Sequence, residues 1–308
     1  MKKRYMLLLL ILAVLLAATA LFLWNKKPNN SVPTVSDGTL ERYPAFESKF
    51  ISSRDVAVWL PEGYQPGDSC DVLYMHDGQM LFDSTTTWNH QEWEVDETLA
   101  RLIKENTVRP TIVVAIDNTS KRLDEYFPTK TYQYVPQDKR KHVDVEEFKG
   151  DEYLRFIVEE LKPFIDEHYK PLTSREHTFM AGSSMGGLIS LYALCEYPQV
   201  FGGVACLSSH LSMAHLSMWM KDEVWANAFR EYVKNHLPEA NSSLIYMDHG
   251  TKDLDAAYGP YQEQLDTVFA QAGWTESHYR SLVFEGHGHK ETFWAMRLPA
   301  ILTYLLSK

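Results

Sequence analysis

Short continuous apolar runs alternate along this chain with longer stretches in which apolar residues recur at helical spacing. Continuous apolar runs are typical of strands that are buried on both faces, as in a parallel sheet. Apolar residues that recur at intervals of three and four indicate helices instead. The pattern predicts strands at 53–60, 71–75, 111–116, 177–181, 203–207, 243–247 and 281–284. It predicts helices at 151–169, 187–194, 260–271 and 291–306.

Strands that alternate with helices predict one α/β domain with a mostly parallel central sheet and helices on both faces. Ligand sites on such sheets lie at the carboxyl ends of the strands. The loops that follow the predicted strands are therefore the places in which to look for chemistry.

One of these loops contains a serine in the pattern G-x-S-x-G, at Gly182-Ser183-Ser184-Met185-Gly186. It stands between a predicted strand and a predicted helix, which is the context of a nucleophile elbow. The positions two before and two after the serine must be small, and only the register centred on Ser184 places glycine at both. Ser184 is the predicted nucleophile. A plain strand-to-helix turn is the alternative reading of the same residues.

A serine nucleophile needs a base, and the base needs an acid that fixes its tautomer. In this architecture the chain order is serine, acid, histidine. The loop after the strand at 243–247 contains Asp248, Asp253 and Asp255, of which Asp253 is the predicted acid. Asp248 lies close to the strand end, where it caps or braces it, and Asp255 begins the next helix in this reading.

The loop after the strand at 281–284 contains His287 and His289. His289 is the predicted base and His287 the alternative. The glycines Gly286 and Gly288 allow this loop to bend back toward the serine.

Backbone N–H groups usually stabilise the oxyanion of such enzymes. One donor is the residue after the nucleophile, here Met185, and the other comes from a loop after a central strand. The segment His76-Asp77-Gly78-Gln79 follows such a strand, and Gln79 is the predicted second donor. His76 and Asp77 are interpreted as a structural pair that braces this loop.

These segments together resemble the Putative esterase family of α/β-hydrolases, which holds esterase D, feruloyl and acetyl-xylan esterases, and enterochelin esterases. The resemblance rests on 73–79 with 81–83, 92–97, 116–118, 181–187, 250–253 and 286–294. It implies the α/β-hydrolase fold and hydrolysis of carboxylic esters. In the family the acid follows the glycine of a G-x-x-D loop, which matches Asp253, and the histidine precedes an acidic residue and a tryptophan, which matches His289. Met80 departs from the family, because many relatives carry asparagine there.

Aromatic residues are frequent in the segments predicted to surround the site. Trp93 and Trp294 are the predicted substrate-binding residues, since aromatic rings stack on sugars or phenolic acyl groups. Ordinary packing at the roots of the loops is the alternative for both. A long polar insertion at 122–143 is predicted to form a lid or a wall of the pocket.

Charge and composition exclude some functions. The chain has 308 residues and a net charge of −11, and residues 1–27 carry five basic side chains and no acid. The remainder carries 25 basic and 41 acidic residues, so nucleic acid is not an expected partner. No cofactor is expected. His249, His287 and His289 match no usual zinc-ligand spacing, so no metal is predicted either.

The N-terminus has the pattern of an export signal. A basic start precedes residues 6–24, which carry no charge, so residues 1–27 are predicted to be a signal peptide or an uncleaved membrane anchor. Residues 28–44 are interpreted as a linker, and 45–308 as the esterase domain. Cys195 and Cys206 are read as two buried apolar side chains rather than a disulfide.

The sequence therefore predicts an extracytoplasmic serine carboxylesterase with an acyl-saccharide, feruloyl, acetyl or siderophore-type substrate. An acyltransferase that uses the same acyl-enzyme is one alternative, and a non-catalytic binding domain of the cell envelope is another. The oligomeric state is not predicted.

Overall fold

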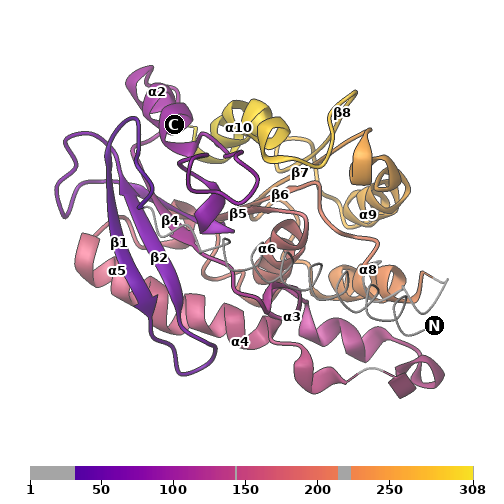
Figure 1. Ribbon diagram of the computed structural model, residues 1–308. Helices are drawn as coiled ribbons and strands as arrows, with labels where there is room; N and C mark the ends of the chain where they lie inside the picture. The colour runs from indigo at the N-terminus through magenta and orange to yellow at the C-terminus, as the bar shows by residue number, and fades with distance from the viewer. Residues whose placement is uncertain (1–31, 143, 214–222, 308) are drawn as a thin grey trace, which may run out of the picture.

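An eight-stranded sheet forms the centre of the protein in the computed structural model, which describes residues 32–142, 144–213 and 223–307 (Figure 1). The spatial order of the strands is β1-β2-β4-β3-β5-β6-β7-β8. β1 and β2 pair antiparallel, as do β2 and β4, and every later pair is parallel. The strands are β1 (Thr39–Phe46), β2 (Arg54–Leu60), β3 (Asp71–His76), β4 (Thr111–Ile116), β5 (Thr178–Ser183), β6 (Gly203–Leu207), β7 (Leu244–Gly250) and β8 (Tyr279–Phe284).

Helices cover both faces of the sheet. The α-helices are α2 (Val95–Lys104), α3 (Arg122–Glu125), α4 (Gly150–Arg155), α5 (Lys162–Tyr169), α6 (Met185–Glu196), α8 (Val224–His236), α9 (Gly259–Gln271) and α10 (Glu291–Leu306). A π-helical segment, η5 (Phe156–Leu161), joins α4 to α5. The 3₁₀ segments are η1 (Gly78–Met80), η2 (Thr129–Tyr134), η3 (Gln137–His142), η4 (Val145–Glu147), η6 (Arg175–His177) and η7 (Asp253–Ala257).

Two apolar cores lie on opposite faces of the sheet. Alternate residues of one strand point to opposite faces, so Val72 and Tyr74 of β3 enter one core, and Leu73 and Met75 enter the other. The first core contains residues of α5, α6, α8 and α9, and the second contains residues of α2 and α10. Figure 1 shows α2 and α10 on one side of the sheet and α5, α6 and α8 on the other. This is the α/β-hydrolase fold predicted from the sequence.

The folded body begins earlier than predicted. β1 starts at Thr39 and pairs with β2, so the boundary at residue 45 is wrong and the linker at 28–44 ends before this strand. The segment before β1 is also attached, because the backbone N–H of Thr34 donates to Asp83 at 2.9 Å.

The predicted signal or anchor, residues 1–27, lies outside the described residues. Among the residues that are described, no helix has both the length and the apolar character that a membrane span requires. Cys195 and Cys206 are both free and buried, as predicted.

Candidate active site

Ser184 stands in a strained turn between β5 and α6. Its backbone has φ 57° and ψ −120°, a region that non-glycine residues rarely occupy. The backbone N–H of Ser184 donates to the carbonyl of Leu207 at 2.9 Å, which ties the turn to the neighbouring strand β6. The turn is tight, since a Cβ on Gly182 would lie 2.8 Å from the carbonyl carbon of Gly186. The predicted elbow is therefore present with the predicted spacing.

Ser184 and His289 line the same cavity, which has a volume of about 520 Å³. We call it the Ser184 cavity. Its lining also includes Gln79, Trp88, Asn89, Gln91, Trp93, Arg122, Ser183 and Trp294. It lies beyond the carboxyl ends of β3, β4, β5 and β8, where the sheet topology predicts a ligand site.

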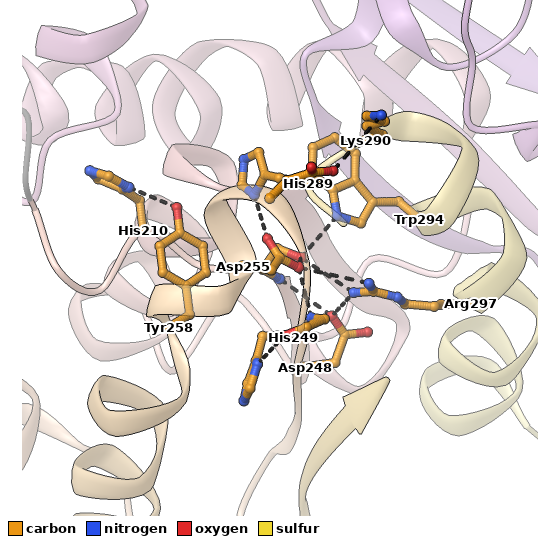
Figure 2. A network of polar contacts seen from close by, with 12 residues as sticks. His210, Asp248, His249, Asp255, Tyr258, His289, Lys290, Trp294 and Arg297 are labelled. Carbon is orange, nitrogen blue, oxygen red and sulfur yellow. Dashed lines mark hydrogen bonds and ion pairs between the residues drawn. The ribbon is translucent and has the colours of Figure 1, made fainter. Parts of the chain in front are cut away.

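The acid that meets His289 is Asp255. Nδ1 of His289 donates to Oδ1 of Asp255 at 2.6 Å, and the Asp255 side chain is fully buried (Figure 2). Asp253, the predicted acid, has a side chain that is 51% exposed and lies 3.8 Å from the Lys290 ammonium. The prediction of Asp253 is wrong because the loop closes into the 3₁₀ turn η7. With three residues per turn, side chains two positions apart point in different directions.

Three hydrogen bonds keep Asp255 ionised. Its Oδ2 accepts from the Ser208 hydroxyl at 2.6 Å and from the Gly250 backbone N–H at 2.7 Å, while Oδ1 accepts from His289. Burial alone would raise the pKa of Asp255, but these hydrogen bonds hold that pKa below its ordinary value.

A buried arginine lies behind this acid. Nη1 of Arg297, on α10, donates to Oδ1 of Asp248 at 2.8 Å, and Nη2 lies 3.8 Å from Oδ2 of Asp255 (Figure 2). Burial raises the pKa of Asp248 to about 6, against the opposing effect of Arg297. Asp248 also accepts from the Ser208 backbone N–H at 3.3 Å, so it braces the end of β7 as predicted.

His287 is not placed as a base. Its Nδ1 accepts a hydrogen bond from Nε of Arg297 at 3.3 Å. Burial and the Arg297 charge lower the pKa of His287. Its backbone carbonyl accepts from the N–H groups of Thr251 and Lys252, so this residue holds the acid loop against the base loop.

The loop after β3 carries the predicted oxyanion donor Gln79. A Cβ on Gly78 would lie 2.7 Å from the carbonyl carbon of Ala115, so glycine lets this loop approach β4 closely. The Gln79 side chain is fixed by the backbone N–H of Asn118, which donates to Oε1 at 3.1 Å. Met185 is the first residue of α6, where a backbone N–H has no partner within the helix.

His76 and Asp77 brace this loop as predicted. Nδ1 of His76 is hydrogen-bonded to the Tyr153 hydroxyl at 2.7 Å. Asp77 accepts two hydrogen bonds from Arg122, at 2.6 and 2.7 Å, and one from Asn118. The insertion at 122–143 thus contributes Arg122 to the wall of the Ser184 cavity.

The predicted substrate-binding residues Trp93 and Trp294 lie in the cavity wall but are largely covered. They are 2% and 5% exposed and their rings lie 5.4 Å apart. Trp294 also packs edge-on against His289 at 5.0 Å, and its Nε1 donates to the Ser208 hydroxyl at 3.0 Å. The exposed ring of this wall is instead Trp88, which is 82% exposed.

Tyr258 was not singled out by any sequence motif, yet it lies beside the candidate triad. Its hydroxyl is 2.9 Å from Nδ1 of His210, and its ring packs edge-on against His289 at 5.8 Å (Figure 2). Burial raises the pKa of Tyr258, and a hydrogen bond with the Ser184 side chain partly opposes this rise. A protonated hydroxyl therefore lies next to the nucleophile.

Buried His76 predicts a pH dependence of stability. Burial lowers the pKa of His76 from 6.5 to about 3. Between these values the unfolded chain binds a proton that the folded protein does not, so stability falls as the pH falls through this window. The slope approaches about 1.4 kcal/mol per pH unit. We expect His76→Asn, which keeps an acceptor near the position of Nδ1, to remove this contribution.

Urea unfolding at pH 7 and pH 5 measures this effect. The parent is expected to lose about 2 kcal/mol more than His76→Asn between these values. The exposed His90 supplies the control His90→Asn, which should behave like the parent. Equal losses in parent and His76→Asn would contradict the assignment.

Comparison with known proteins decides the family. The profile of the Esterase family, described as "Putative esterase", matches residues 48–305. The chain belongs to this family. Membership of this family favours hydrolysis of carboxylic esters.

Curated relatives match over part of their length. The uncharacterized protein YbbA of Bacillus subtilis is 25% identical over 174 residues, which are 56% of this chain and 60% of that protein. The siderophore enterobactin esterase of Emericella nidulans is 31% identical over 158 residues, or 47% of each chain. The chain thus spans about three fifths or less of the length of these two relatives.

Solved structures share the fold. A ferulic acid esterase superposes with a TM-score of 0.64 at 20% sequence identity. The match covers 87% of this chain and 98% of the esterase chain. The enterobactin esterase FES from Shigella flexneri superposes with a TM-score of 0.62 at 19% sequence identity. The match covers 91% of this chain and 62% of the FES chain. At such identities the likeness concerns the fold alone.

Proposed function

We propose that this esterase is a serine carboxylesterase with the triad Ser184, His289 and Asp255. The observation that carries the proposal is the placement of Ser184, in a strained turn, on the same cavity as a histidine that donates to a buried carboxylate. Ser184 is the nucleophile, His289 the general base and acid, and Asp255 the group that fixes the histidine tautomer.

The reaction follows two steps. Oγ of Ser184 attacks the acyl carbon while Nε2 of His289 takes the hydroxyl proton, and the imidazolium is stabilised by Asp255. The tetrahedral intermediate then collapses, and His289 returns the proton to the departing alcohol. A water molecule, deprotonated by His289, attacks the acyl-enzyme. As the bond between the acyl carbon and Oγ breaks, His289 returns this proton to Ser184 and the carboxylic acid departs.

The oxyanion is proposed to be held by the backbone N–H groups of Gln79 and Met185. The fixed Gln79 side chain, the close approach at Gly78 and the start of α6 support this assignment. Losing one such donor typically costs about 10²–10³ in kcat.

For the substrate we propose an ester with a feruloyl, acetyl-saccharide or siderophore-type group. The Ser184 cavity of about 520 Å³ has room for an aromatic acyl group, and Trp88 presents an open ring at its rim. The relatives and structural neighbours named as ferulic acid and enterobactin esterases support the same substrate classes.

Trp88→Ala tests the role of this ring. Aromatic stacking contributes about 0.5–1.5 kcal/mol, so KM for a feruloyl ester is expected to rise about two- to tenfold with little change in kcat. Steady-state kinetics on methyl ferulate measure this, with an aliphatic acyl ester as the control substrate. An equal rise in KM for both substrates would show that Trp88 acts on folding of the wall rather than on the aromatic acyl group.

The function itself is tested with a fluorophosphonate and a panel of esters. We expect the probe to label the full chain at Ser184, as peptide mass spectrometry would show, and to block hydrolysis of p-nitrophenyl acyl esters. Methyl ferulate, an acetylated oligosaccharide and a catechol siderophore lactone then rank the acyl and alcohol groups. Ester hydrolysis that survives complete labelling would contradict the serine mechanism.

Transfer to an alcohol is the second function that the same acyl-enzyme supports. Product analysis with a saccharide acceptor separates the two, since a transferase forms a new ester and a hydrolase forms the free acid. We also propose an extracytoplasmic location, which is supported by the basic and then uncharged pattern of residues 1–24.

A further inference from the structure

Three carboxylates converge at the start of α2, away from the triad. Glu92 precedes the helix, and Asp96 and Glu97 lie in its first turn. One oxygen of each lies within 4.8 Å of one oxygen of both others. The esterase reaction proposed above makes no use of these groups.

These carboxylates have buried oxygens without partners. Asp96 is 0% exposed, and its Oδ1 has no hydrogen-bond partner among the described residues. The same holds for Oε2 of Glu92 and Oε2 of Glu97. Ser36 donates to the other oxygen of two of these carboxylates. Its backbone N–H donates to Oδ2 of Asp96 and its hydroxyl to Oε1 of Glu97.

The nearby basic side chains are engaged elsewhere. Arg101 pairs with Glu105 at 3.2 Å, and Lys104 pairs with Asp37 at 3.3 Å. Within the part of the chain that the structure describes, no ion pair includes Glu92, Asp96 or Glu97. Buried negative charge without a partner is costly, so the cluster favours either a bound cation or a proton shared between carboxylates.

We propose that this cluster binds a calcium ion. Calcium prefers carboxylate oxygens at 2.3–2.6 Å, so two of its ligands lie at most about 5 Å apart. The separations within 4.8 Å meet this limit. Three carboxylates supply three of the six to eight oxygens, and water supplies the rest. Glu97 and Ser36 also line a hollow of about 450 Å³ at the surface, together with Arg101 and Lys104.

The ion would connect one segment of the Ser184 cavity wall to α2. Glu92 belongs to the segment between η1 and α2, which carries the cavity residues Trp88, Asn89 and Gln91, while Asp96 and Glu97 belong to the helix. Calcium that bridges these carboxylates would add a direct link between this segment and α2. Binding therefore stabilises the wall of the cavity as well as the fold.

A shared proton is the competing occupant. Burial is the main cause that raises the pKa of Asp96 to about 7, and Glu97 adds to the rise. A protonated Asp96 would donate to its neighbour and leave no need for a cation. The two occupants differ in their response to metal, because only a cation site would bind Tb³⁺ or calcium.

Terbium luminescence tests the proposal, because Tb³⁺ replaces calcium and Trp93 is the next residue to Glu92. The full chain is stripped of metal with a chelator and titrated with Tb³⁺ while tryptophan is excited. We expect sensitised emission that calcium displaces, and a melting temperature that rises with calcium concentration. Asp96→Asn and the partly exposed Glu97→Gln should each weaken terbium binding about tenfold or more, since affinity depends on the number of charged ligands.

Glu94→Gln is the matched control. It removes the same charge from the same segment, but Glu94 is exposed and lies outside the cluster. The control should bind terbium like the parent. No saturable emission from the parent, with a melting temperature indifferent to calcium, would overturn the proposal in favour of the shared proton. An equal loss of binding in Glu94→Gln would also overturn it, because it would indicate diffuse attraction to acidic surface.

Discussion

Replacing Ser184 by alanine is expected to lower kcat for ester hydrolysis by about 10⁶, because the triad acts as a unit and no other group can form the acyl-enzyme. A residual rate above water is expected from the oxyanion donors and from substrate binding. The folded structure should persist, since the Ser184 hydroxyl is not part of the core. Single-turnover kinetics on a p-nitrophenyl ester, together with the melting temperature, measure both expectations.

Ser183→Ala is the matched control for this variant. Ser183 also lines the Ser184 cavity, but it is the last residue of β5 and is 3% exposed. It lacks the positive φ of its neighbour, so its hydroxyl is not presented at the turn. We expect its kcat to stay close to that of the parent. A large loss of kcat in Ser183→Ala, with a kcat close to the parent in Ser184→Ala, would place the nucleophile at Ser183.

Replacing Asp255 by asparagine is expected to lower kcat by about 10⁴, the size of effect that this change has in serine proteases. The amide would favour the wrong tautomer of His289 and would remove the charge that stabilises the imidazolium. The Arg297 charge nearby would then face one carboxylate, Asp248, instead of two. The loss should appear in kcat more than in KM, because the interaction is strongest in the transition state.

Asp253→Asn separates the two candidate acids. It removes the same charge two residues away, from a side chain that is half exposed and paired only loosely with Lys290. We expect kcat within about twofold of the parent, since surface substitutions of this kind change stability and activity little. A loss of 10³ or more in Asp253→Asn, with Asp255→Asn active, would sink the assignment of Asp255.

Much of the fold was predictable because the central strands are apolar on both faces. The runs at 71–75 and 111–116 became β3 and β4, and the periodic stretch at 151–169 became α4, η5 and α5. β1 was missed because it is an edge strand with a largely exposed surface, so its sequence has no apolar alternation. α2 and α8 were not predicted either, although both bury one face.

The candidate site was only partly predictable. Ser184 and His289 follow from short motifs at strand ends, and the structure does place both on one cavity. The choice between Asp253 and Asp255 depends on a 3₁₀ turn that spacing does not reveal. Ser208, Tyr258 and Arg297 come from three distant segments and carry no local motif, so their meeting depends on tertiary packing.

The position of Arg297 ties the base and the buried cation of the site to one helix. His289, Trp294 and Arg297 lie in or just before α10, and this helix packs on α2, β6 and β7. If α10 detaches from the sheet, Asp255 loses in one event both the histidine that it orients and the cation beside it. Ester hydrolysis is therefore expected to depend on the docking of this helix, even where the turn at Ser184 keeps its shape.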